Sequence, residues 1–123
     1  MLTRSQVFAT AGRIMLAGMP EGYDAFFLAG LAGEAGQPIL HVARDEQRMM
    51  ATVEAARFFA PGLEVLPFPA WDCLPYDRAS PNVRAVSRRI ETMVRLSQPA
   101  AGQRLVVTTV NALLQRVPPR SFF

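Results

Sequence analysis

Apolar and polar residues recur with two different periods along the chain, and the change of period predicts where helices and strands lie. In several segments, separated by Gly and Pro, apolar residues return every three or four positions, which is the period of an amphipathic helix. Between them lie short, continuous apolar runs with β-branched residues, as is typical of strands covered on both faces of a parallel sheet. The predicted helices span residues 23–35, 46–59, 81 or 82 to 96, and 111–117, and the predicted strands span residues 39–43, 63–68 and 104–109.

Helices and strands alternate in this prediction, which favours an α/β fold. A strand, a helix and a second strand in succession form a right-handed crossover between parallel strands. We therefore predict a three-layer α/β domain with a mainly parallel sheet, formed by residues 1–123 as a single unit. Residues 1–12 are predicted to be an irregular lead-in, although apolar residues between positions 6 and 16 also have near-helical spacing, interrupted by Gly12.

The third predicted helix has two chemically distinct sides. An amphipathic helix usually buries its apolar side against the core. The apolar stripe consists of Val83, Val86, Ile90, Met93, Val94 and Leu96. The opposite side carries Arg84, Arg88, Glu91 and Arg95.

The composition excludes several classes of protein. Half of the 123 residues are apolar and 19% are charged, so the chain can bury a core and is unlike a disordered protein. No apolar run approaches the roughly 18 residues that cross a bilayer, and the start of the chain lacks a convincing signal peptide. One cysteine (Cys73) and one histidine (His41) cannot form an internal disulfide or a standard zinc site. We expect a soluble, cytoplasmic protein without membrane contact.

Charge is distributed unevenly along the chain. Residues 1–77 contain five Arg and nine acidic residues, whereas residues 78–123 contain eight Arg and one acid. Clustered guanidiniums bind phosphate and carboxylate groups well, and Arg84, Arg88 and Arg89 form the tightest cluster. These residues are a candidate contact for DNA, a partner protein or a neighbouring domain. The alternative interpretation is a solvated helix face.

The proline-rich loop after the second predicted strand carries two aromatic residues, Trp71 and Tyr76. Together with Arg78 they could stack on a nucleobase. A tryptophan beside prolines is more often a packing anchor, which is the interpretation that we favour.

In α/β folds a phosphate tends to bind where a strand gives way to a helix N-terminus, because the free N–H groups there attract anions. Here the position to test is residues 16–25, at the start of the first long helix. A phosphate-binding loop needs the pattern G-x-x-x-x-G-K-[ST]. Aligning Gly18 with its first glycine places Asp24 at the lysine and Ala25 at the hydroxyl residue, with Gly22 one position before the second glycine. An anion replaces the cation and a methyl replaces the Mg²⁺ ligand. We therefore predict a degenerate loop that does not bind a nucleotide.

Two runs of sequence, FPAWDCLPYDRASPN at residues 68–82 and VVTTVNALLQRVPP at residues 106–119, carry a family resemblance. They resemble the N-terminal region of bacterial transcription-repair coupling factors, and the resemblance covers nearly all of residues 13–123. It implies a domain similar to that of the excision-repair protein UvrB, with a degenerate copy of its P-loop NTPase site. In UvrB the loop is intact and a tyrosine-rich hairpin grips DNA, whereas the corresponding stretch here is too short for a long hairpin.

The resemblance implies a role within a larger protein. Coupling factors are ATP-dependent DNA translocases that release stalled RNA polymerase and recruit the nucleotide excision repair machinery. This segment is then the first N-terminal subdomain, a non-catalytic scaffold with no metal or cofactor, while ATP and Mg²⁺ act elsewhere in the parent protein. The implied partners are the rest of the coupling factor chain and, through it, UvrA, RNA polymerase and double-stranded DNA. The alternative is a small, stand-alone DNA- or nucleotide-binding α/β domain.

Overall fold

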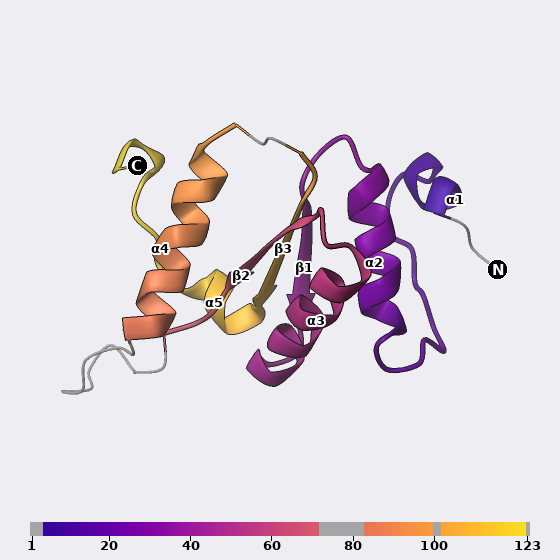
Figure 1. The fold of residues 1–123 in the computed structure, drawn as a ribbon, viewed down its shortest axis with the longest axis horizontal. Helices are drawn as coiled ribbons and strands as arrows, with labels where there is room; N and C mark the ends of the chain where they lie inside the picture. Colours follow the sequence, from indigo (N-terminus) through magenta and orange to yellow (C-terminus); the bar gives the residue numbers. More distant parts are fainter. Residues whose placement is uncertain (1–3, 72–82, 100–101, 123) are drawn as a thin grey trace.

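The computed structural model describes residues 4–71, 83–99 and 102–122, in which helices and strands alternate (Figure 1). The elements are α1 (Arg4–Ala9), α2 (Tyr23–Glu34), β1 (Ile39–Ala43), α3 (Glu46–Phe59), β2 (Glu64–Phe68), α4 (Val83–Ser97), β3 (Arg104–Thr109), α5 (Val110–Leu114) and the 3-10 helix η1 (Arg120–Phe122). The predicted strands and long helices are therefore present. Part of the expected lead-in is helical (α1), and α5 is shorter than predicted.

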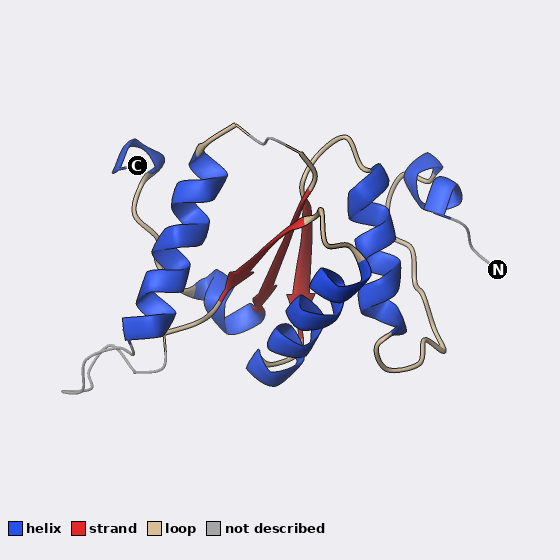
Figure 2. Ribbon diagram, in the orientation of Figure 1, coloured by secondary structure: helices blue, strands red, loops and turns tan. Residues whose placement is uncertain are grey.

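The three strands form a parallel sheet in the order β1-β3-β2. The crossover from β1 to β2 runs through α3, and the crossover from β2 to β3 runs through α4. Helices α2 and α3 lie on one side of the sheet, and α4 and α5 lie on the other (Figure 2). This arrangement confirms the predicted three-layer α/β fold.

The larger core lies between the sheet and the pair α2 and α3. Its buried residues are Ala32, Ala43, Met49, Val53, Ala56, Val65, Leu105 and Val107. Asp45 precedes helix α3 as its N-cap, and its side chain accepts a hydrogen bond from the Arg48 N–H at 2.8 Å. The spacing of Met49, Val53 and Ala56 then directs one face of the helix onto the sheet, as the sequence predicts.

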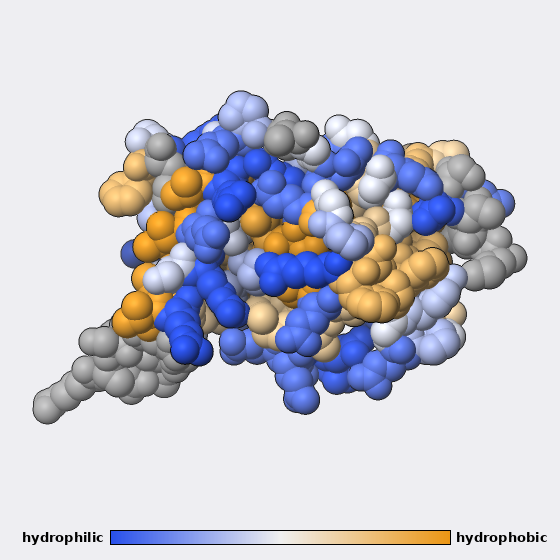
Figure 3. Space-filling view, in the orientation of Figure 1, coloured by the Kyte–Doolittle hydropathy of each residue, from blue (hydrophilic) through white to orange (hydrophobic). Residues whose placement is uncertain are grey.

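Helix α4 packs against the sheet through polar residues. Arg89 and Thr92 are its buried residues, and Arg89 is only 1% exposed. The expectation that the apolar stripe faces the core is wrong for its outer members, since Val83 is 77% exposed and Ile90 48% exposed. Figure 3 shows hydrophobic surface along the outer side of α4. The smaller core on this side consists of Leu66, Phe68, Val106 and Ala112, with Ala70 and Met93 packed against it.

Strand β1 is covered on one face only. Side chains alternate between the two faces of a strand, and Ala43 is buried on the side of α2 and α3. On the other face Leu40 is 57% exposed and Val42 is 39% exposed. The prediction of a strand covered on both faces is therefore wrong for β1, because α4 and α5 reach β2 and β3 but leave β1 uncovered.

Candidate functional site

The loop before α2 contains two glycines in the left-handed region. Gly18 has a φ of 75° and Gly22, the residue that precedes the helix, has a φ of 88°. No strand precedes this loop, because the described residues from 10 to 22 have no regular structure that pairs with the sheet.

Asp24, in the first turn of α2, is held by Arg48 of α3. Its Oδ2 accepts a hydrogen bond from Arg48 Nη2 at 2.9 Å, and its Oδ1 accepts one from the Ala25 N–H at 2.9 Å. The other end of the same guanidinium donates to Glu21 Oε1 at 2.9 Å. A helix N-terminus attracts anions, and here two carboxylates of the chain itself lie beside it.

The side chains around this helix start differ from the lysine and hydroxyl residue of a phosphate-binding loop. The guanidinium of Arg48 is paired with Asp24 and Glu21. Ala25 is buried and has no hydroxyl for a Mg²⁺ ion. Within the described residues there is also no group of three or more His, Cys, Asp or Glu side chains that could hold a metal.

His41 lies in the same region, in the middle of β1. It lines a small cavity of about 190 Å³ together with Asp24 and Arg48. Burial lowers the pKa of His41 from its ordinary value, and Arg48 lowers it further, while the charge of Asp24 acts in the opposite direction. The imidazole is therefore favoured in its neutral form.

Arg89 occupies the interior rather than the surface. Its Nη1 donates to the carbonyl oxygens of Pro69 at 2.8 Å and Ala112 at 3.3 Å, and its Nη2 donates to that of Arg116 at 3.5 Å. Burial lowers the pKa of Arg89. The sequence predicts Arg89 in an exposed contact cluster, and this is wrong because the side chain is buried, where it bonds to backbone carbonyls after β2 and in the C-terminal region.

Trp71 is part of the packing around Arg89. The guanidinium lies 5.2 Å from the Trp71 ring and 4.2 Å from the Phe68 ring, within the range of cation–π attraction. The Trp71 backbone N–H donates to Gln115 Oε1 at 2.7 Å, and its carbonyl accepts from Gln115 Nε2 at 3.3 Å. These contacts agree with a packing anchor. Tyr76, the other aromatic candidate, lies outside the described residues.

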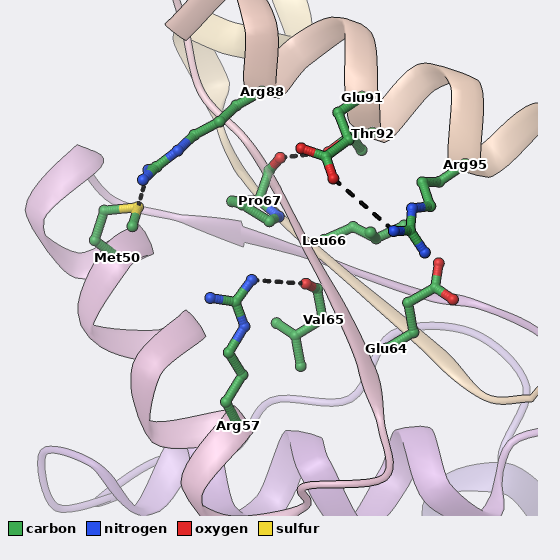
Figure 4. Close-up of a pocket in the computed structure, with 10 residues that line it drawn as sticks. All are labelled: Met50, Arg57, Glu64, Val65, Leu66, Pro67, Arg88, Glu91, Thr92 and Arg95. Atoms are coloured by element: carbon green, nitrogen blue, oxygen red, sulfur yellow. Dashed lines mark hydrogen bonds and ion pairs between the residues drawn. The ribbon is translucent and has the colours of Figure 1, made fainter. Parts of the chain in front are cut away.

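Arg84 and Arg88 are exposed on α4, and Arg88 points into a cleft along the edge of β2 (Figure 4). The cleft has a volume of about 250 Å³ and lies between α3 and α4. It is lined by Met50, Arg57, Glu64, Val65, Leu66, Pro67, Arg88, Glu91, Thr92 and Arg95. The structure thus groups Arg88 with Arg57 and Arg95. Sequence reasoning missed Arg57 as a site residue because its approach across β2 depends on the tertiary fold.

Side chains close the edge of β2 at the floor of the cleft. Arg57 Nη2 donates to the Val65 carbonyl at 3.2 Å, and Thr92 Oγ1 donates to the Pro67 carbonyl at 2.6 Å. Pro67 itself has no N–H. This stretch of edge therefore lacks the alternating donors and acceptors that another strand would need.

Glu64, at one end of the cleft, is balanced by a buried arginine. Its Oε1 lies 3.2 Å from Arg104 Nε, although neither of these atoms has an aligned hydrogen bond. The pair is held by charge attraction, while Arg104 Nη1 donates separately to the Gln98 carbonyl at 3.0 Å. Glu64 therefore contributes little net negative charge to the cleft.

Comparison with known proteins finds relatives of one kind. The chain is 38% identical over 85 residues to the transcription-repair-coupling factor of Rickettsia prowazekii, which covers 69% of this chain and 7% of that protein. It is 32% identical over 105 residues to the factor of Rickettsia bellii, covering 85% of this chain and 9% of that protein. The chain belongs to the transcription-repair-coupling factor family.

The coupling factor of a further bacterium also matches most of the chain. The transcription-repair-coupling factor of Escherichia coli is 31% identical over 98 residues, which is 80% of this chain and 8% of that protein. The chain therefore spans less than a tenth of the length of these coupling factors. No family model matches it. In the described part of the chain, none of the helices has the length and apolar character needed to cross a membrane.

Proposed function

We propose that the chain is a non-catalytic scaffold module of a transcription-repair-coupling factor, equivalent to a UvrB-like N-terminal subdomain. The parent protein would be the ATP-dependent translocase that releases stalled RNA polymerase and recruits the excision machinery through UvrA. In this proposal the module carries no reaction and holds the recruiting parts of the same protein in place. The family membership supports a place within a coupling factor, and the apolar surface of the module supports a scaffold role.

The observation that carries the proposal is the apolar surface on the α4 side of the sheet. Leu40 and Val42 of β1 and Val83 and Ile90 of α4 are substantially exposed. Parallel sheets are normally covered on both faces, and each buried Å² of apolar surface contributes about 25 cal/mol. This surface is suited to pack against further polypeptide of the coupling factor.

The same proposal includes that this module does not bind a nucleotide. It is supported by the carboxylates of Glu21 and Asp24, which already engage Arg48 beside the start of α2. ATP and Mg²⁺ would bind elsewhere in the parent protein. Saturable ATP binding to the 123-residue chain would contradict this part of the proposal.

The scaffold role is tested by placing a charge on the uncovered face of β1. Leu40→Glu should change the unfolding free energy of the isolated chain by less than about 0.5 kcal/mol, because the side chain already faces solvent. In a full-length coupling factor that carries this segment, the same change should lower the melting temperature and increase amide exchange in β1.

Phe58→Glu on α3 is the matched control, since Phe58 is exposed on a helix of the opposite layer. It should have little effect in either protein. Equal effects of Leu40→Glu in the isolated chain and in the full-length factor would show that β1 is not an interface, and the scaffold proposal would fail.

The alternative of a stand-alone DNA-binding domain is weakened by the structure. It relied on a surface formed by Arg84, Arg88 and Arg89, and Arg89 is buried. Arg84 and Arg88 stay exposed one helical turn apart on α4, and of the two only Arg88 lines the cleft.

A further inference from the structure

We propose that the cleft between α3 and α4 is a binding site for a carboxylate side chain on an acidic segment of a partner protein. Arg57, Arg88 and Arg95 converge over the edge of β2 from two helices (Figure 4). This inference goes beyond the scaffold role and does not depend on it, because the cleft lies on the other flank of α4 from the exposed apolar stripe.

The three guanidiniums are incompletely satisfied by the described residues. Each has five N–H donors. Arg57 donates to one carbonyl, and Arg88 donates to the sulfur of Met50 at 3.6 Å, which is a weak acceptor. Arg95 Nη2 lies 4.0 Å from Glu91 Oε1, too far for a hydrogen bond. A further acceptor in the cleft would find unused donors on both walls.

The charge in the cleft favours an anion. Glu64 is balanced by Arg104, so the three guanidiniums face Glu91 as the one lining carboxylate that lacks a close partner. A recess with an excess of one sign of charge concentrates its field on the opening. Guanidiniums bind carboxylates through paired, charge-assisted hydrogen bonds, which fixes the geometry as well as the charge.

The shape of the cleft favours a single side chain over a strand or a nucleic acid. The carbonyls of Val65 and Pro67 are already bonded, so a strand cannot pair with β2 there. A volume of about 250 Å³ accepts the end of a Glu or Asp side chain but not a duplex. Glu91 on the lining would also repel a continuous phosphate chain. The partner is therefore an acidic protein segment.

The experiment uses fluorescein-labelled hexaglutamate peptide as the probe and the 123-residue chain as the receptor, with binding followed by fluorescence anisotropy. We expect saturable binding that weakens as salt is raised. The double variant Arg88→Gln with Arg95→Gln should bind about tenfold more weakly, since two charge-assisted hydrogen bonds are lost.

The matched control is Arg44→Gln with Arg120→Gln, which removes the same charge from exposed sites outside the cleft. It should retain the affinity of the unmodified chain within about twofold. An equal loss in both double variants would mean that the peptide responds only to net charge, and the proposed site would be wrong. Absence of saturable hexaglutamate binding would overturn it as well.

A third variant separates the site from any defect in folding. Glu91→Gln removes the competing carboxylate and should tighten hexaglutamate binding, an effect that partial unfolding cannot produce. Unchanged or weaker binding by this variant would contradict the proposal. In parallel titrations, a 12-base-pair duplex and inorganic phosphate should each bind the cleft double variant and the control double variant with equal affinity. If the duplex instead bound more weakly to the cleft double variant, the cleft would be assigned to nucleic acid and the proposal would be wrong.

Discussion

The guanidinium of Arg89 lies 4.2 Å from the centre of the Phe68 ring, which places a positive charge against the aromatic core at the end of β2. The same side chain donates to backbone carbonyls from the segment after β2 and from the C-terminal region. Arg89 therefore joins α4 to both segments, and this is why α4 turns a polar side to the sheet.

We expect Arg89→Ala to lower the unfolding free energy by about 2–4 kcal/mol, because it leaves buried carbonyls without a donor and creates a cavity. Urea denaturation of the chain measures the change. Arg88→Ala is the control from the neighbouring, exposed position, and it should cost less than about 0.5 kcal/mol. Similar losses for the two variants would show that Arg89 has no special structural role.

Thr92→Val should destabilise the chain by about 1 kcal/mol, because the partly buried Pro67 carbonyl loses its donor while the side-chain volume is nearly kept. Thr92→Ser keeps the hydroxyl and should retain more of the stability than Thr92→Val. The order of the two denaturation midpoints is the measurement. If Ser were the more damaging replacement, packing of the methyl group would outweigh the hydrogen bond.

Asp24→Asn should lower the unfolding free energy by about 1 kcal/mol, since its partly buried carboxylate pairs with Arg48 at 2.9 Å. Glu21→Gln tests the other arm of the same arginine. Glu21 is largely exposed, so its loss should cost only a few tenths of a kcal/mol at most. A larger effect at Glu21 than at Asp24 would contradict the interpretation of the pair as the inner and outer arms of one site.

Stability should fall as the pH drops from about 7 towards 5, in part through His41. Burial lowers the pKa of His41 in the folded state, so the unfolded chain binds a proton more readily as the pH falls through the unfolded pKa of about 6.5. The contribution is present above that pKa and is lost as the pH falls towards the folded pKa. His41→Gln should flatten this part of the profile, measured as melting temperature against pH. An unchanged slope would assign the pH dependence to other groups.

The sequence predicts the fold well because its signals are local. Residues 104–109 read as a buried strand from their β-branched composition, and they form the fully buried centre of the sheet. Asp45, directly before the predicted helix at residues 46–59, is a residue type that favours the N-cap position, and it accepts a hydrogen bond from the Arg48 N–H. Such features depend on neighbours within a few residues.

The orientation of α4 and the cleft were not predictable in the same way. The carbonyls that accept from Arg89 come from segments that meet only in the folded chain. The apolar stripe with Val83 and Ile90 therefore predicts the wrong inner face for α4. Arg57 and Arg88 likewise come from different helices and line one cleft at the edge of β2, which no local pattern indicates.

The bonded carbonyls along β2 also limit how copies of this module could associate. Endless β-ribbons require two open edges on every unit, so that each copy can accept one neighbour on either side. Here Pro67, Thr92 and Arg57 close one edge, and among the described strands only β1 offers the other. Edge-to-edge pairing through β1 would consequently stop at two copies. The closed edge of β2 therefore prevents the sheet from extending into a fibre.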